Sequence, residues 1–160
     1  MQCVAPVNGT CPVGCLSCVC AAPDTPISTP GGPRPIASLR EGDLVLSMNR
    51  GQVVAVPVLR TKRIAVSSRH TVVRATLGTG AVLEISAPHP TADGRRFGDL
   101  HAGDDLGGLP IVAAEIVPYG HDATYDILPA SDSGTYFAAG ALVGSTLAAP
   151  ANLPLCASVP

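Results

Sequence analysis

The sequence predicts an all-β protein, and three observations support this prediction. Glycine (17) and proline (16) together make about a fifth of the 160 residues, which is too many for a helical bundle and lacks the period of collagen. The apolar residues are mostly Val, Leu, Ile and Ala, with three Tyr, two Phe and no Trp. They form short runs separated by turn residues, a pattern typical of many strands joined by tight connections.

The individual strands can be placed from residue 43 onwards. We expect them at 43–47, 53–66, 70–77, 81–86, 109–120, 123–129, 135–140 and 141–147. The segments 49–51 and 78–80 have the composition of hairpin turns. Pro57 predicts an edge or a bulge in the second run, because proline cannot donate to a strand ladder. The uncharged run 141–147 is expected to be buried on both faces, and 36–43 to contain one short helical turn.

Charge and length exclude several functional classes. The formal net charge is −2 and only 14% of residues are charged, so nothing indicates a nucleic-acid partner. No run of eighteen apolar residues predicts a membrane span, and no signal peptide is visible. We expect a monomer with one folded domain and no cofactor.

The six cysteines divide the chain. Five lie in the first twenty residues, and none lies between Cys20 and the last one; they are Cys3, Cys11, Cys15, Cys18, Cys20 and Cys156. A disulfide framework normally spreads through the fold that it staples. We therefore expect a cysteine-rich segment at 1–19, a domain at 20–147 and an irregular Pro/Ala-rich tail at 148–160. The clustering itself favours a secreted or cell-envelope location over the cytoplasm.

Three interpretations of Cys20 remain open at this point: a disulfide partner, a zinc ligand or a nucleophile. Four thiols between Cys11 and Cys20 have the density of a zinc site, but the final Cys-x-Cys spacing is tight for tetrahedral closure, so we expect no metal. Disulfides are expected among Cys3, Cys11, Cys15, Cys18 and Cys156. A strained Cys18–Cys20 bond would mask Cys20 until it was reduced.

The chain also contains an internal repeat. Residues 25–43 align without a gap on residues 86–104, at an offset of 61 residues throughout. The alignment pairs Thr25 with Ser86 and superposes two Leu-x-x-Gly-Asp motifs, which end at Asp43 and Asp104. Two copies of one β-turn-β unit predict a pseudo-two-fold β domain. The simpler interpretation is that this motif is merely a common way to enter a strand.

The repeat places a thiol opposite an imidazole. Cys20 lies five residues before the first copy, and His89 follows Ser86 in the second copy between Pro88 and Pro90. The two prolines restrict the backbone and hold the ring in place. If the copies face each other, Cys20 and His89 converge, which is the arrangement of sulfur nucleophilic catalysis.

These motifs resemble those of the Hint domain, the fold of inteins and of the C-terminal part of hedgehog proteins. The resemblance covers about residues 20–147, and no block is specific alone, but the blocks occur in the family's order. They are Cys20 with Thr25 and Ile27; Ser86-x-x-His89-Pro90; Leu100 to Asp104; Tyr125-Asp126-Ile127; and Phe137-x-x-Gly140-x-x-Val143. The resemblance implies a horseshoe of curved antiparallel strands.

The resemblance also implies a single-turnover, cysteine-dependent reaction. Cys20 would attack the carbonyl of Val19 in an N-to-S acyl shift, and water, a thiol or another small nucleophile would resolve the thioester. Residues 1–19 would then be the substrate, like the flanking segment of an intein. His89 would protonate the leaving amine, Ser86 would hold the scissile peptide or the imidazole ring by hydrogen bonding, and Asp126 would activate the thiol or align its attack.

One departure from the family's pattern limits this chemistry. Inteins end in His-Asn, and the Asn cyclises to break the second bond; here those positions are Gly144 and Ser145. Serine has no amide to cyclise, so we expect cleavage without splicing, with Ser145 near the site. The alternative is a non-catalytic, disulfide-stapled β scaffold of a secreted or surface protein. His70, His101 and His121 have the sequence context of surface or turn residues and receive no role.

Overall fold

The computed structural model describes residues 20–148 and is built almost entirely from strands. Two 3-10 helices interrupt them, η1 (Ile36–Ser38) and η2 (Phe97–Asp99). The strands are β1 (Pro26–Ile27), β2 (Arg34–Pro35), β3 (Leu44–Asn49), β4 (Gln52–Ala65), β5 (Thr71–Leu77), β6 (Val82–Ile85), β7 (Asp105–Leu106), β8 (Leu109–Pro118), β9 (Ala123–Pro129), β10 (Tyr136–Ala138) and β11 (Ala141–Val143). The all-β prediction is confirmed.

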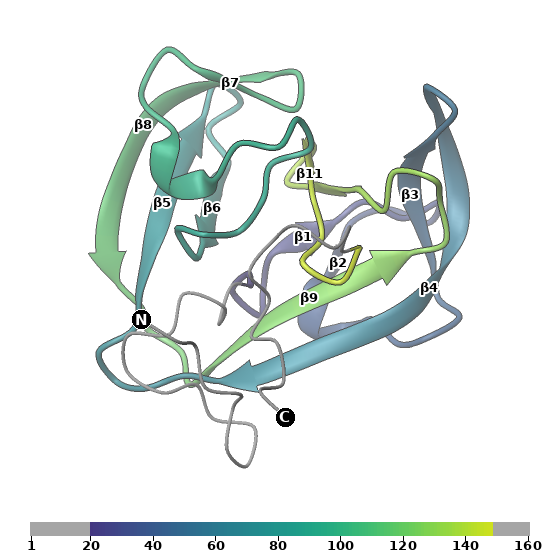
Figure 1. Cartoon of the computed structure of the whole chain (residues 1–160), viewed down its shortest axis with the longest axis horizontal. Helices are drawn as coiled ribbons and strands as arrows, with labels where there is room; N and C mark the ends of the chain where they lie inside the picture. The colour runs from purple at the N-terminus through teal and green to yellow at the C-terminus, as the bar shows by residue number, and fades with distance from the viewer. Residues whose placement is uncertain (1–19, 149–160) are drawn as a thin grey trace, which may run out of the picture.

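Three antiparallel sheets form the fold, with the orders β11-β10-β1-β2, β3-β4-β9 and β6-β5-β8-β7. Figure 1 shows the β5–β8 sheet and the β3–β4 hairpin on opposite sides, with β1, β2 and β11 between them. The long strand β4 pairs first with β3 and then with β9, with a register shift between Val58 and Arg60. Pro57 lies directly before this shift, as expected for a residue that cannot continue the ladder.

Both predicted hairpin turns are present. Arg50 and Gly51 join β3 to β4 with φ angles of 51° and 74°, the left-handed pair that suits a two-residue hairpin. The second turn, at 78–80, joins β5 to β6. The last predicted strand is only partly correct: β11 ends at Val143, although Gly144, Ser145 and Thr146 are buried as expected.

The repeat in the sequence is also a repeat in the structure. η1 and η2 begin 61 residues apart, and each is followed by the same hydrogen-bonded turn. The side chain of Asp43 accepts from the Arg40 amide at 2.9 Å, and that of Asp104 accepts from the His101 amide at 2.8 Å. The local fold therefore supports a duplication and not only a recurring turn motif.

The gapless alignment is wrong before the two 3-10 helices. The amide of Ile36 donates to the carbonyl of Thr25, whereas the equivalent amide of Phe97 donates to the carbonyl of His89. The structural partner of Thr25 is thus His89 and not Ser86. The second copy is three residues shorter between the strand and the 3-10 helix, a gap that composition alone does not reveal.

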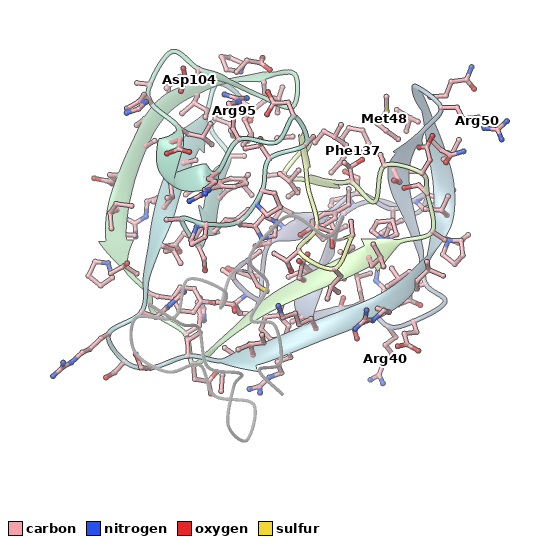
Figure 2. The ribbon with its side chains drawn as sticks, viewed as in Figure 1. Arg40, Met48, Arg50, Arg95, Asp104 and Phe137 are labelled. Carbon is pink, nitrogen blue, oxygen red and sulfur yellow. The ribbon has the colours of Figure 1, made fainter. Side chains whose placement is uncertain are left out.

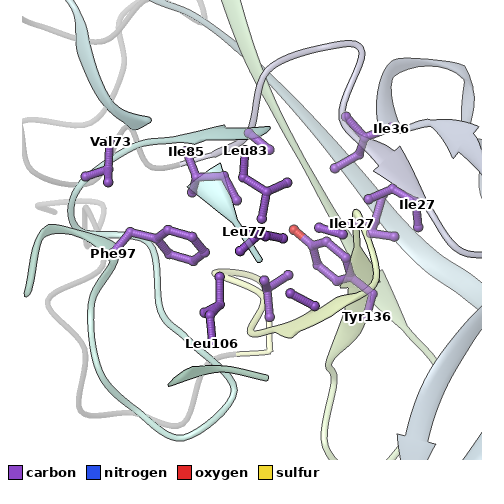
Figure 3. Close-up of a cluster of buried hydrophobic side chains, with 14 of the residues drawn as sticks. Ile27, Ile36, Val73, Leu77, Leu83, Ile85, Phe97, Leu106, Ile127 and Tyr136 are labelled. Carbon is purple, nitrogen blue, oxygen red and sulfur yellow. The ribbon is translucent and has the colours of Figure 1, made fainter. Parts of the chain in front are cut away.

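A single large cluster of apolar side chains fills the space between the sheets. Phe97 of the second copy and Leu106 of β7 pack with Leu77 and Tyr136 in this cluster (Figure 3). All four side chains are almost completely buried. Charged residues of the turns, such as Arg40 and Arg50, point outward (Figure 2). No helix within 20–148 is long and apolar enough to cross a membrane.

Candidate functional site

Cys20 is a free thiol buried at the centre of the fold. The next residue, Ala21, bridges to both Ile85 and Tyr125, so the chain enters between β6 and β9. Ala21 and Tyr125 exchange two backbone hydrogen bonds of 2.8 Å. This pairing fixes the backbone of Cys20. The other five cysteines lie outside the described residues, so the predicted disulfides remain predictions.

Burial raises the pKa of the Cys20 thiol to about 12, and the negative charge of Asp126 adds to this effect. Lys62 and hydrogen bonds from Thr124 and Thr146 act in the opposite direction. The Thr124 hydroxyl has no well-formed hydrogen bond in the described structure, although it lies close enough to favour the thiolate. The resting thiol is protonated at neutral pH, so an attack needs a base beside it.

Ser86 holds the backbone of Cys20. Its amide donates to the Cys20 carbonyl at 3.2 Å, and its hydroxyl donates to the same oxygen at 3.2 Å. The amide of Cys20 donates back to the Ser86 hydroxyl at 3.4 Å. The nitrogen of the Val19–Cys20 peptide therefore lies 3.4 Å from the Ser86 hydroxyl oxygen.

His89 is completely buried on the other side of Ser86. Its amide donates to the Ser86 carbonyl at 3.0 Å, and its ring packs edge-on against Phe97 at 5.8 Å between centroids. The ring Nε2 lies 2.8 Å from the carbonyl oxygen of Gly144. A carbonyl oxygen can only accept, so Nε2 carries a hydrogen and donates it to Gly144.

Asp126 on β9 is a buried carboxylate with four donors. Tyr136 Oη and the Ile127 amide each donate to its Oδ1 at 2.8 Å. The amide and hydroxyl of Thr146 both donate to Oδ2. Burial and the nearby Asp126 charge raise the pKa of Tyr136, so the phenol stays a donor. This network stabilises a charged carboxylate beside the thiol.

Ser145 is adjacent to the site, but its hydroxyl has another function. It donates to the Ile127 carbonyl at 2.6 Å and accepts from the Leu147 amide at 3.1 Å. These bonds fix the segment after β11. It is the following residue, Thr146, that contacts Asp126 and favours the Cys20 thiolate.

A chain of contacts through Gly144 and Thr146 links the predicted site residues. Ser86 forms hydrogen bonds with both Cys20 and His89. The His89 ring contacts the Gly144 carbonyl oxygen. Two residues later, the Thr146 amide donates to Asp126, whose charge raises the pKa of Cys20. The geometry thus brings together Cys20, Ser86, His89, Asp126 and Ser145, with the Ser145 hydroxyl turned to the backbone of β9. No group of three or more potential metal ligands occurs within 20–148.

The sequence analysis missed several neighbours of the site. Lys62 pairs in register with Asp126 across β4 and β9, and Thr124 lies two residues before Asp126 on the same face. No motif marks them, because strand register alone brings them to the thiol. His70, to which the sequence analysis gave no role, closes the turn at 67–70 and is half-buried, and its Nε2 lies 3.0 Å from the Ser86 hydroxyl.

The raised pKa of Cys20 predicts a loss of stability in alkali. The folded state keeps the proton up to about pH 12, whereas the unfolded thiol releases it near pH 9.0. The stabilisation is complete below pH 9.0 and is lost as the pH rises towards 12. The pKa values of Tyr119 and Tyr136 are raised too, so these residues also lose stabilisation as the pH rises. The quantity to measure is therefore the difference in free energy of unfolding between the wild type and Cys20→Ala. In urea unfolding, this difference should change by up to about 1.4 kcal/mol per pH unit; parallel pH profiles would contradict it.

The fold is that of inteins and intein-like domains. A bacterial intein-like domain from Clostridium thermocellum superposes with a TM-score of 0.65 at 24% identity, covering 79% of this chain and 96% of that one. The gp41-1 intein superposes with a TM-score of 0.61 at 24% identity, covering 79% of this chain and 98% of that one. A DnaB intein from Synechocystis superposes with a TM-score of 0.63 at 16% identity, covering 80% of this chain and 99% of that one.

These similarities are structural, and at this level of identity they show the fold alone. No family model and no curated protein matches the sequence. The chain therefore has the Hint-type fold, as its motifs predicted. What it does with that fold has to be argued from its own site.

Proposed function

We propose that this chain is a self-processing domain that cleaves the Val19–Cys20 bond through a thioester and does not splice. The observation that carries the proposal is the chain of contacts that leads from Cys20 to the other predicted residues. A hydroxyl contacts the scissile nitrogen of a buried cysteine, and the same segment carries a buried imidazole, while the charge of a buried carboxylate acts on the thiol. A scaffold has no need to bury these groups together.

The proposed reaction begins with the thiol. Cys20 Sγ loses its proton to Asp126, whose charge lies near it, and attacks the carbonyl carbon of Val19. A carbon–sulfur bond forms and the carbon–nitrogen bond breaks. The Cys20 nitrogen leaves as an amine after taking a proton from His89, the general acid that the motif predicts. Water or a solution thiol then attacks the thioester and releases residues 1–19.

The first step alone is unfavourable, because an amide is more stable than a thioester. Ser86 holds Cys20 on both sides: its hydroxyl accepts from the scissile nitrogen at 3.4 Å, and its amide and hydroxyl both donate to the Cys20 carbonyl. Contacts that fix Cys20 in this way reduce the orientational freedom that must be lost before the sulfur attacks. Removal of the acyl group by an external nucleophile then makes the reaction irreversible.

The structure supports the proposed lack of splicing. A Cβ atom built on Gly144 would lie 2.9 Å from the Thr91 carbonyl oxygen and 3.1 Å from that of Pro90. Both are backbone atoms, so a histidine side chain does not fit at Gly144 without a shift of the chain. Ser145 has no amide to cyclise. The reaction is thereby limited to the N-terminal bond.

One observation favours the alternative, a non-catalytic scaffold. A thiol with its pKa raised to about 12 is a poor nucleophile unless it is activated. If the Val19–Cys20 bond never breaks, the same contacts would serve only to anchor the start of the domain. The two functions predict different masses for the purified chain.

The test is the mass of the full 160-residue chain over time, with and without dithiothreitol. Self-processing predicts a fragment that begins at Cys20 and accumulates in the thiol. Cys20→Ala should stay intact, whereas the matched control Cys18→Ala should be cleaved like the wild type. A wild-type chain that stays intact under all these conditions would support the scaffold instead. Cleavage in the absence and presence of reductant at equal rates would exclude a disulfide that masks Cys20.

A further inference from the structure

The hydroxyl of Ser86 has three partners, and the third has no assigned role. Cys20 supplies two of them, its amide as donor and its carbonyl as acceptor. The third is the ring Nε2 of His70, at 3.0 Å. A serine hydroxyl has one hydrogen and two lone pairs, so its partners cannot be satisfied independently.

Counting the hydrogen fixes what each partner must do. When the Ser86 hydroxyl donates to the Cys20 carbonyl and accepts from the Cys20 amide, one lone pair remains. That lone pair needs a donor, so His70 must carry a hydrogen on Nε2. If Nε2 is instead bare, the Ser86 hydroxyl turns to donate to it, and the Cys20 carbonyl loses that bond.

His70 is held firmly in this position. Its amide donates to the Ser67 carbonyl at 3.1 Å, and its carbonyl accepts from the Tyr119 amide at 3.0 Å. The ring packs edge-on against Tyr119 with 5.4 Å between centroids. The Tyr119 hydroxyl is itself anchored on the Ala123 carbonyl at 2.6 Å. The contact with Ser86 is therefore part of a built arrangement between β5, β6 and β8.

Building on the proposed function, we propose that His70 is a positioning residue whose charged form turns the Ser86 hydroxyl towards Cys20. Protonated His70 carries hydrogens on both ring nitrogens, so it must donate to Ser86. Neutral His70 has a tautomer with a bare Nε2, which releases Ser86 from the Cys20 carbonyl. The bond between Ser86 and the Cys20 carbonyl, on the opposite side of Cys20 from the scissile Val19–Cys20 peptide, thus depends on pH.

The surroundings decide where this dependence lies. Burial lowers the pKa of His70 from its usual 6.5, so the charged form is lost at a pH below 6.5. Tyr119 faces the ring directly, and His121 packs on the far side of Tyr119 at 5.3 Å. Tyr125, Glu84, Asp24 and Cys20 are the further titratable groups whose charge acts on Tyr119.

The experiment compares cleavage rates of full-length variants across pH. His70→Ala should slow cleavage about tenfold below pH 6.5, the loss expected for one positioned hydrogen bond. His70→Gln keeps a side-chain N–H near the Nε2 position and should restore the rate to within about twofold there. As the pH rises, the ratio of the wild-type to the His70→Gln rate should fall, because only histidine titrates.

His121→Gln is the matched control, since it also contacts Tyr119 but not Ser86 in the described structure. It should keep the wild-type pH profile. A His70→Ala variant as fast as the wild type, or a rate ratio independent of pH, would overturn the role of His70 while leaving self-cleavage intact.

A second readout does not depend on cleavage. In the inactive Cys20→Ala chain, NMR titration follows the imidazole of His70. Adding Ser86→Ala should shift the pKa of His70, whereas Thr79→Ala, an exposed hydroxyl on the β5–β6 turn, should not. If the wild type never cleaves, the proposed function fails, and this titration still decides whether His70 and Ser86 are coupled; an unchanged pKa would contradict the coupling.

Discussion

Replacing His89 with alanine is expected to slow cleavage of the Val19–Cys20 bond by about 10²–10⁴-fold, the usual contribution of a positioned general acid. His89 is completely buried, and its Nε2 is held 2.8 Å from the Gly144 carbonyl oxygen. The measurement is the first-order rate at which the Cys20 fragment appears in dithiothreitol. His101→Ala, at a ring that is 83% exposed, should cleave at the wild-type rate.

Loss of packing has to be separated from loss of acid chemistry. The His89 ring contacts Phe97 in the core, so His89→Ala also leaves a cavity. His89→Gln fills more of that space and keeps a donor for Gly144, but it has no proton to transfer at neutral pH. It should unfold closer to the wild-type temperature and still cleave slowly. A folded His89→Gln chain that cleaves at full rate would remove His89 from the mechanism.

Replacing Asp126 with alanine is expected to lower the free energy of unfolding by about 3 kcal/mol or more, because it leaves several buried donors unpaired. The Tyr136 hydroxyl and both donors of Thr146 lose their acceptor. Urea unfolding of the purified variant measures the change. Asp122→Ala, at a side chain that is 92% exposed, is the matched control and should change the free energy of unfolding by less than about 0.5 kcal/mol.

Asp126→Asn tests the charge and not the shape. Removing the negative charge should lower the pKa of Cys20 from about 12, so alkylation of the folded thiol becomes faster at a given pH. Cleavage should nevertheless become slower, because an amide cannot take the thiol proton. Faster alkylation together with faster cleavage would show that Asp126 only suppresses the thiol and does not activate it.

The strands and hairpins could be predicted because their signals are local. The hairpin turn at Arg50 and Gly51 and the register shift of β4 after Pro57 depend on backbone preferences that a few residues determine. The pairing of Thr25 with His89 could not be predicted in the same way. It depends on a three-residue gap that only the hydrogen bonds of the two copies reveal.

The site was predictable where residue chemistry is distinctive. Cys20 and His89 stood out because a thiol and a proline-flanked imidazole are unusual in an otherwise apolar β domain. Lys62 and His70 did not stand out. Lys62 lies opposite Asp126 through the register of β4 with β9, and His70 contacts Ser86, which is distant from it in the sequence. Such contacts between strands distant in sequence need coordinates.

The most direct test of thioester formation is the chemistry of the released N-terminal fragment. Hydroxylamine attacks a thioester at the acyl carbon, so incubation of the full-length chain should release a fragment whose C-terminal residue is Val19 carrying a hydroxamate. Tandem mass spectrometry locates that group, and Cys20→Ala should yield none. The account predicts a hydroxamate at Val19; a wild-type chain that stays whole in hydroxylamine, or a fragment that ends anywhere else, would contradict it.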